Sequence, residues 1–287
     1  MRPIEDEWGI VRLQNCILNI AKYIHDFCEE NGVIYCLMGG SALGAVRHGG
    51  FIPWDDDMDI FMTPDNYEKF RKLFKEKGDK ENFFLQEKSL GGLVSTAKLR
   101  YNFSSYIEEI EMNKDVHKGV FVDIFILHNC PDKPLSRKWQ YYWAKYIVSK
   151  GLADRGAEKA GSMGIMLSLL RVLPPASLIG FALNQLYKYR NEDTQCLCHF
   201  LGHAKMRKGL YPREFFSSVK LMPFETVSLY VPGRIEEYLT ARWGDYMKLP
   251  PLEERKVAQH CVRWSDTESF PGFNEKGLYK DENLMFP

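Results

Sequence analysis

The first part of the chain has its apolar residues on one face of a helix. They recur at alternating steps of three and four positions, at Ile10, Leu13, Ile17, Ile20, Ile24 and Phe27. This spacing predicts an amphipathic α-helix. We expect the helix to end at Asn31-Gly32, because glycine readily adopts the left-handed conformation that closes helices. Residues 33–37 are a short apolar run of strand length, and the Gly39-Gly40-Ser41 turn then opens a second helix over 41–48.

Acidic and apolar residues alternate at the start of the run from Asp57 to Met62. On a strand, side chains two positions apart leave the same face, so Asp57 and Asp59 would share one face and Met58 and Ile60 the other. Thr63 then caps a helix that has proline at its first position, and this helix is expected to end near residue 78.

Further strands are predicted at residues 83–86, 96–101 and 120–127, and the last of these is an apolar run broken by one acid, Asp123. The first half of the chain is therefore α/β in character. Residues 136–190 are helical and aromatic in pattern, and two short strands at 219–231 precede a last helix at 233–243. We predict an α/β catalytic core over 1–130, including the first helix. A mostly helical region over 131–287 would pack on it and complete the substrate site.

The longest apolar stretch, residues 162–186, is interrupted by Arg171 and by Pro174-Pro175. It falls short of the ~20 uninterrupted apolar residues that a membrane-spanning helix needs. The prolines suit the first turn of a second helix, so we predict a helical hairpin. Its apolar faces belong either in a protein core or on a bilayer surface, and core packing is the more common use of such sequence.

Composition excludes some classes of protein. With 45% hydrophobic and 26% charged residues among 287, the chain is expected to fold rather than remain disordered. It has 38 Lys and Arg against 38 Asp and Glu. A net charge of zero argues against a partner selected by bulk charge, so we expect no nucleic-acid partner.

Seven cysteines without a CxxC pair suggest no disulfide framework and favour a reducing compartment. Cys196, Cys198, His199 and His203 match no common zinc spacing, and core packing accounts for them better. The acidic amino terminus does not read as a signal peptide, so we expect a cytoplasmic protein, with peripheral contact at the inner face of the membrane as the alternative that the apolar hairpin allows.

Four acids occupy five positions at Asp55, Asp56, Asp57 and Asp59. A solvated acidic turn is the ordinary explanation of such a cluster. Here the shared face of Asp57 and Asp59, and the lone Asp123 in an apolar strand, favour a bound divalent cation, since buried carboxylates are costly without a partner. The helix start at Gly40-Ser41 offers backbone N–H groups to a phosphate. Together these features predict phosphoryl-transfer chemistry.

The same residues carry a family resemblance. Gly40-Ser41, Asp57-x-Asp59 and the later Asp123 are similar to the pattern of the nucleotidyltransferase superfamily. More closely, the segment GGSALGAVRHGGFIPWDDDMDIFM at 39–62 resembles the signature of the LicD family of phosphotransferases, to which fukutin and fukutin-related protein are also similar. The resemblance covers nearly the whole chain, including Lys98-Leu99-Arg100, 119–125 and 243–251, and is weakest over 136–210.

This resemblance implies a nucleotidyltransferase-like mixed sheet with flanking helices. It also implies transfer of a phospho-alcohol, typically phosphocholine, from a CDP-linked donor to a hydroxyl of a cell-surface glycan or its lipid-linked precursor, with release of CMP. One or two Mg²⁺ ions would be bound by Asp57, Asp59 and Asp123, with Mn²⁺ as the other candidate ion. Two alternatives keep the fold: nucleotidyl transfer from an NTP to a small acceptor, and a binding protein without turnover.

In that chemistry Asp57 and Asp59 would coordinate the ion, and Asp123 would share it and accept the proton of the acceptor hydroxyl. Lys98 and Arg100 alternate on a predicted strand and suit a diphosphate, although a solvated strand face is the ordinary alternative. Asp55 and Asp56 are either supports for the metal ligands or turn residues.

Other residues are candidates for binding the donor. Arg47 and His48 end the helix after the glycine turn, where cations also serve as simple caps. Trp54 could stack on cytosine, cover a choline cation or pack in the core. Arg255 and His260 are candidates only through the family resemblance.

Overall fold

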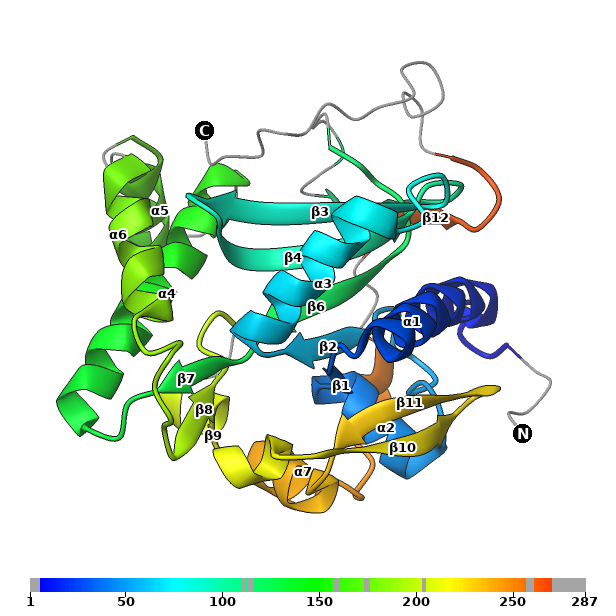
Figure 1. The fold of residues 1–287 in the computed structure, drawn as a ribbon. Coiled ribbons are helices and arrows are strands. Elements are labelled where there is room, and N and C mark those ends of the chain that lie inside the picture. Colours follow the sequence, from blue (N-terminus) through cyan, green and yellow to red (C-terminus); the bar gives the residue numbers. More distant parts are fainter. Residues whose placement is uncertain are drawn as a thin grey trace. The chain divides into compact units, whose positions relative to one another are not determined.

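The computed structural model describes residues 6–109, 112, 116–156, 161–172, 176–202, 205–256 and 261–269 (Figure 1). The described chain forms two compact units. Unit 1 takes its described residues from 6–86, 98–125 and 214–269, and unit 2 takes them from 87–97 and 126–213. The chain leaves unit 1 for residues 87–97 and again after Phe125, and it returns to unit 1 at Glu214. The division of the chain at residue 130 into a catalytic core and a helical region stays a prediction.

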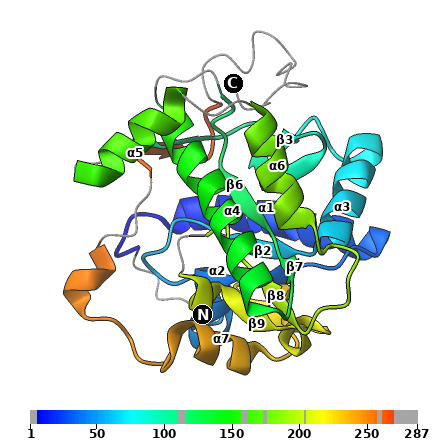
Figure 2. The same ribbon diagram turned by 90° about the vertical axis from the view of Figure 1, so that its left-hand side faces the viewer.

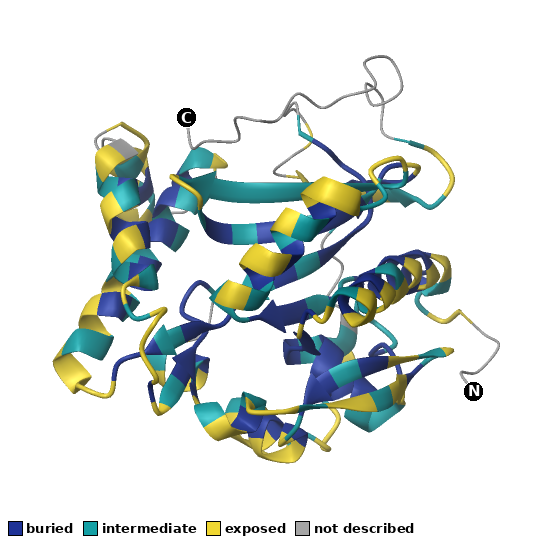
Figure 3. Ribbon diagram, in the orientation of Figure 1, coloured by how far each residue is buried: buried dark blue, intermediate teal, exposed yellow. Residues whose placement is uncertain are grey.

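A five-stranded mixed sheet positions the candidate site. Its order is β1 (Cys36–Leu37), β2 (Asp59–Met62), β6 (Phe121–Ile126), β4 (Leu93–Tyr101) and β3 (Phe83–Leu90). Strand β1 pairs with β2 antiparallel. In Figure 3 the inner strands β2 and β6 are mostly buried, whereas every residue of β3, at the sheet edge, is half-buried. The predicted α/β class is confirmed, with seven α-helices in the described residues.

The helices of unit 1 follow the predicted signals closely. They are α1 (Val11–Asn31), α2 (Gly39–His48), α3 (Pro64–Lys77) and α7 (Ile235–Trp243). Helix α1 buries its apolar face and ends at Gly32, whose φ of 58° is left-handed. At the start of α3 the backbone N–H of Asn66 donates to Oγ1 of Thr63, so threonine caps the helix as predicted.

Two strand pairs complete unit 1. The predicted strands at 219–231 form the antiparallel hairpin of β10 (Val219–Phe224) and β11 (Val227–Pro232), which packs against β1. Strand β5 (Ser105–Ile107) pairs with β12 (Arg263–Ser265), which joins segments more than 150 residues apart. This second pairing was not predicted, because three-residue strands carry no readable alternation. Short 3₁₀ helices lie at Leu252–Lys256 in unit 1, at Met206–Gly209 in unit 2, and at Arg213–Phe216, where the chain passes from unit 2 to unit 1.

Unit 2 contains three helices and a small sheet (Figure 2). The helices are α4 (Pro134–Asp154), α5 (Gly161–Val172) and α6 (Ala176–Tyr187), and the sheet has the order β7 (His128–Cys130), β8 (Cys196–Cys198) and β9 (Leu210–Pro212). Its core contains Ala144 and Ile147 of α4, Leu183 and Leu186 of α6, and Phe200. The helices predicted for residues 136–190 are therefore present in the described part of that range, whereas the small sheet was not predicted.

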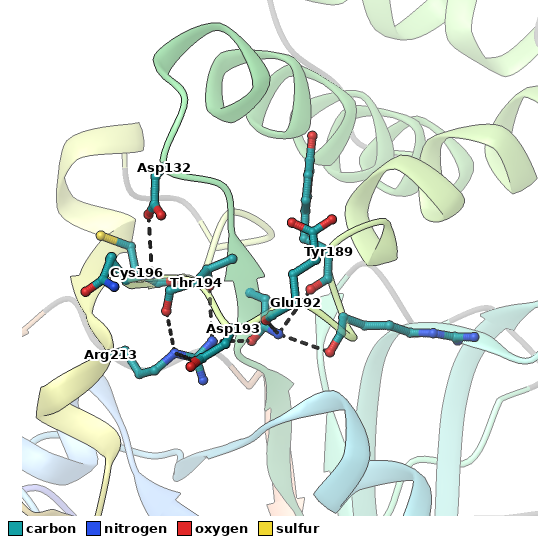
Figure 4. A network of polar contacts seen from close by, with 10 residues as sticks. Asp132, Tyr189, Glu192, Asp193, Thr194, Cys196 and Arg213 are labelled. Carbon is teal, nitrogen blue, oxygen red and sulfur yellow. Dashed lines mark hydrogen bonds and ion pairs between the residues drawn. The ribbon is translucent and has the colours of Figure 1, made fainter.

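Polar contacts hold the loop between α6 and β8 in place (Figure 4). Asn129 donates from Nδ2 to the backbone oxygens of Tyr189, Arg190 and Glu192. Arg213 donates from Nη2 to Oδ1 of Asn129 and to Oγ1 of Thr194. The loop's backbone is thus satisfied by side chains, as a connection without its own secondary structure requires.

Candidate active site

Carboxylates from two neighbouring strands meet at one end of the sheet in unit 1. Asp59 is the first residue of β2, Asp57 precedes it by two positions, and Asp123 lies on the adjacent strand β6. The backbone N–H of Asp123 donates to the oxygen of Met58 over 2.9 Å, which fixes the register of the two segments. Met58 is fully buried and the three carboxylates are half-buried, so the predicted alternation is present. We call Asp55, Asp57, Asp59 and Asp123 the acidic site.

Burial and mutual repulsion both act on the carboxylates of the acidic site. Burial raises the pKa of Asp59 well above its ordinary value, and the charges of Asp57, Asp123 and Asp55 raise it further. Lys98 acts in the opposite direction. Its Nζ lies 3.5 Å from Oδ1 of Asp123, and both side chains are about one-fifth exposed. Because the neighbouring carboxylates raise the pKa of Asp59, the site favours a bound cation.

The glycine turn lets helix α2 approach these carboxylates. A Cβ at Gly40 would lie 2.8 Å from Oδ2 of Asp55, which is too close for any other residue without a shift. Gly39 has a left-handed φ of 52° and a Cβ there would contact Asp59. The backbone N–H of Asp59 donates to Oγ of Ser41 over 2.9 Å. The turn and the helix start therefore lie directly beside the acidic site.

Lys98 and Arg100 project from one face of β4 onto the same aromatic ring. Lys98 Nζ lies 3.4 Å and Arg100 Cζ 4.8 Å from the centroid of Phe121. Arg100 is fully buried and donates to Oε1 of Gln86 and to the backbone oxygen of Gly119. Lys98 thus reaches the acidic site, while Arg100 packs beneath the strand and ties it to its neighbours.

A second group gathers four of the predicted donor-binding residues. We call Arg47, His48, Trp54 and Arg255 the Trp54 cluster. Arg255 Cζ lies 5.0 Å from the Trp54 ring centroid, and the His48 ring lies 6.2 Å from it. Arg47 donates from Nε to Nε2 of His48 over 3.0 Å. Burial, followed by the charge of Arg255, lowers the pKa of Arg47. The cluster is therefore cationic and joins segments 200 residues apart.

The remaining predicted residue, His260, lies outside the described residues. His203, which belonged to the zinc alternative, does so as well. Cys198 and His199 are buried in unit 2. Within the described residues, no three His, Cys, Asp or Glu side chains are assembled as a ready metal cage, in the acidic site or elsewhere. The oxygen-only donors of the acidic site are nevertheless those that Mg²⁺ prefers.

Two supports of the acidic loop were missed in the sequence. Gln14 on α1 is buried and donates from Nε2 to the backbone oxygens of Asp55, over 2.7 Å, and of Ile52. A polar residue on the apolar face of that helix was the available signal. The Tyr106 hydroxyl donates to Oδ2 of Asp56 over 3.0 Å, and nothing in the local pattern around Tyr106 indicated this contact.

Two further supports come from the last third of the chain. The backbone N–H of Gly39 donates to the hydroxyl oxygen of Tyr238 over 2.9 Å. The N–H of Phe51 donates to Oε1 of Glu225 over 3.0 Å. Helix α7 and the turn between β10 and β11 thus hold the two ends of the segment that contains the glycine turn and α2.

Comparison with known proteins identifies the relatives of this chain. A family model described as LicD/FKTN/FKRP, nucleotidyltransferase domain, matches residues 32–152. The chain is 31% identical over 250 residues to the lipopolysaccharide cholinephosphotransferase LicD of Haemophilus influenzae, an alignment covering 83% of this chain and 91% of that protein. It is 32% identical over 106 residues to the human ribitol 5-phosphate transferase FKRP, covering 36% of this chain and 21% of FKRP. The mouse FKRP matches similarly, at 35% over 91 residues.

The α/β fold and these relatives define the class of this protein as a phosphotransferase. Within that class, the chain belongs to the LicD family. The resemblance predicted from residues 39–62 is thereby confirmed. The acidic site, Gly40, Ser41 and Lys98 all lie inside the matched range of the family model, whereas Arg255 lies outside it.

Proposed function

We propose that this protein transfers a phospho-alcohol, phosphocholine in the first instance, from a CDP-linked donor to a hydroxyl of a cell-surface glycan or its lipid-linked precursor, releasing CMP. Relatives named for cholinephosphate and for ribitol 5-phosphate transfer support this class of reaction. The observation that carries the proposal is the acidic site itself, where burial and the charges of Asp57, Asp123 and Asp55 raise the pKa of Asp59 beside the start of α2.

We propose Asp57, Asp59 and Asp123 as the ligands of one or two Mg²⁺ ions, with Mn²⁺ as the other candidate. The raised pKa of Asp59 supports this, because its causes, burial followed by repulsion from neighbouring carboxylates, are both relieved by a bound divalent cation. When bound, the ion would neutralise the donor diphosphate and lower the pKa of the acceptor hydroxyl.

The protein's own groups would complete the reaction. Lys98 is exposed enough to bind a phosphate oxygen, and the first N–H groups of α2 at Gly40 and Ser41 favour a negative charge. Asp123 would accept the proton of the acceptor hydroxyl, and its Oδ1 lies 3.5 Å from Nζ of Lys98. Arg100, buried behind Phe121, would hold β4 in position rather than contact the donor.

We propose that the Trp54 cluster binds the nucleotide part of the donor. Two guanidinium groups in one cluster repel a choline cation and attract a phosphate. The Trp54 ring offers a stacking surface for cytosine. His260 remains a predicted donor contact on the basis of the family resemblance. We place the reaction in the cytoplasm, because all seven cysteines are free, as in a reducing compartment.

The test is CMP release from CDP-choline, CDP-ribitol and CDP-glycerol, each with a glycan acceptor and with or without Mg²⁺. We expect Mg²⁺-dependent release with one of the three donors. Asp57→Asn, Asp59→Asn and Asp123→Asn should each lower the rate by about 100-fold or more, as loss of one electrostatic group in a transfer site does. The matched control is Asp193→Asn, because Asp193 lies in unit 2 with a 97% exposed side chain.

Two results would redirect the proposal. Release of pyrophosphate from CTP or ATP, without CMP release from any CDP-alcohol, would indicate nucleotidyl transfer. Thermal stabilisation by a CDP-alcohol without release of CMP would indicate a binding protein, since a ligand at ~100 times its Kd adds about 2.7 kcal/mol to the folded state.

A further inference from the structure

Helix α5 exposes most of its apolar side chains. Only Leu167 is fully buried. The exposed large residues have fractional exposures between 37% and 83%: Met163, Ile165, Met166, Leu169 and Val172. Soluble proteins rarely leave such a contiguous apolar surface on a helix unless something covers it. Within the part of unit 2 that the structure describes, α5 packs against α4 and leaves these residues open.

Helix α6 differs sharply from α5, although the two have similar composition. Ile179, Ala182, Leu183 and Leu186 are 0–1% exposed and form the core of unit 2 with α4. The apolar stretch at 162–186 therefore has two uses. Its second half, α6, packs in the core, as such sequences most often do. Its first half, α5, is exposed, so contact with a bilayer surface remains an alternative for α5.

Helix α4 carries a second set of exposed large side chains. Leu135, Trp139 and Tyr142 recur at steps of four and three and are 81%, 51% and 66% exposed. Arg171 donates from Nε to the backbone oxygen of Ala153, which ties the end of α5 to the end of α4. Trp and Tyr are the residues that bilayer interfaces favour.

The charge of this region complements an anionic surface. From the start of α4 to the end of α6 the sequence has seven basic residues (Arg137, Lys138, Lys145, Lys150, Arg155, Lys159 and Arg171) and two acidic ones, Asp154 and Glu158. The region thus carries a formal charge of 7 − 2 = +5 within a chain whose net charge is zero. Neither α5 nor α6 contains an acid.

We propose that α5 and the exposed stripe of α4 dock on the surface of a lipid bilayer that contains anionic headgroups. In this arrangement the apolar side chains enter the interface and Arg155, Arg171 and Lys138 face the headgroups. The helix lies on the membrane. No single helix among the described residues is long and apolar enough to cross a membrane. Helix α5 and residues 177–187 reach that length and apolar composition only as a pair, which is bent by 110°. This proposal goes beyond the transfer reaction and does not depend on it.

The experiment is sedimentation of the full chain with vesicles of phosphatidylcholine, with and without phosphatidylglycerol. We expect binding that requires phosphatidylglycerol and weakens as salt rises. The double variant Ile165→Glu with Leu169→Glu should reduce the bound fraction at least about tenfold, since it removes two side chains from the apolar phase and adds two like charges. The two residues substituted here are exposed, as are the two in the control variant described next. Both variants should therefore fold, and circular dichroism checks this.

The matched control is Ile34→Glu with Leu221→Glu, an Ile and Leu pair in unit 1 that is 56% and 54% exposed. It should bind vesicles like the unsubstituted protein. A second readout uses Trp139, whose fluorescence should shift to the blue with anionic vesicles and lose that shift in Trp139→Phe. CMP release from soluble substrates should be the same in both double variants, which separates failure of docking from failure of the proposed transfer reaction.

Three outcomes would overturn the proposal: no sedimentation of the unsubstituted protein with either vesicle, equal loss in both double variants, or a dimer in sedimentation velocity that only Ile165→Glu with Leu169→Glu abolishes. The last would assign the surface to a second copy of the chain.

Discussion

The Tyr106 hydroxyl donates to Oδ2 of Asp56 over 3.0 Å, and both side chains are 1% exposed. This contact divides the acidic run at 55–57, because Asp56 is held inside unit 1 by β5 while Asp55 and Asp57 contribute to the repulsion around Asp59. Burial, followed by the charge of Asp56, raises the pKa of Tyr106, so the phenol stays a hydrogen-bond donor. Asp56 is therefore anchored to β5 by this hydrogen bond, while its role in the reaction stays a prediction.

Removing this hydrogen bond should destabilise the protein. For Tyr106→Phe we expect the free energy of unfolding to fall by about 1–3 kcal/mol, because the bond is buried and its acceptor is a carboxylate. Urea denaturation at neutral pH measures it. The control is Tyr142→Phe, whose side chain is 66% exposed and whose effect should stay within about 0.5 kcal/mol. Equal effects of the two substitutions would show that the Tyr106 hydroxyl contributes nothing.

The charge of Lys98 should set the pH range of the reaction. Lys98 lowers the pKa of Asp59, so Lys98→Met should raise that pKa further and move the acidic limb of activity to higher pH. The measurement is the pH profile of Mg²⁺-dependent CMP release. Lys188→Met, at an exposed position in unit 2, should leave the acidic limb where it is. An acidic limb shifted to lower pH in Lys98→Met would contradict the electrostatic assignment.

A methyl group at Gly40 should disturb the acidic site. In Gly40→Ala the new Cβ would meet Oδ2 of Asp55 at 2.8 Å, so the carboxylate or the start of α2 must move. We expect a loss of about 1–3 kcal/mol in unfolding free energy and at least tenfold in transfer rate, as misplacement of reacting groups produces. Gly180→Ala is the control, because its Cβ would find only an ordinary contact at 3.6 Å.

His117 should make the protein sensitive to acid. The backbone N–H of Gly119 donates to Nδ1 of His117, and the other ring nitrogen lies 3.1 Å from Oδ1 of Asn102, so the ring is neutral with its proton on Nε2. Burial, followed by the charge of Arg100, lowers the pKa of His117 to about 3. Burial also lowers the pKa of His128 to about 3.

The sign follows from proton uptake on unfolding. Below pH 6.5 the unfolded chain binds a proton at each of these histidines and the folded chain does not, so stability falls as the pH drops from 6.5 to about 3. Each histidine contributes up to about 1.4 kcal/mol per pH unit. Urea denaturation over this range should show a shallower slope for His117→Gln than for the unsubstituted protein. A slope unaffected by His117→Gln would mean that the ring is protonated in the folded state.

Local patterns in the sequence determined much of the fold and the acidic centre of the candidate site. The 3.6-residue period of α1 and the Thr63-Pro64 start of α3 depend only on residues close in the chain. The same holds for the alternation that separates Asp57 and Asp59 from Met58, and for the single acid Asp123 in an apolar strand.

Only the tertiary structure decided which distant residues support that centre. Gln14 and Tyr106 contact the acidic loop from α1 and β5, and Arg255 reaches Trp54 from 200 residues away. The tertiary structure also placed α6 in the core of unit 2 and left α5 exposed, although the two helices have similar composition. Periodicity reports which face of an element is apolar, whereas the partner of that face depends on long-range packing, which no local pattern encodes.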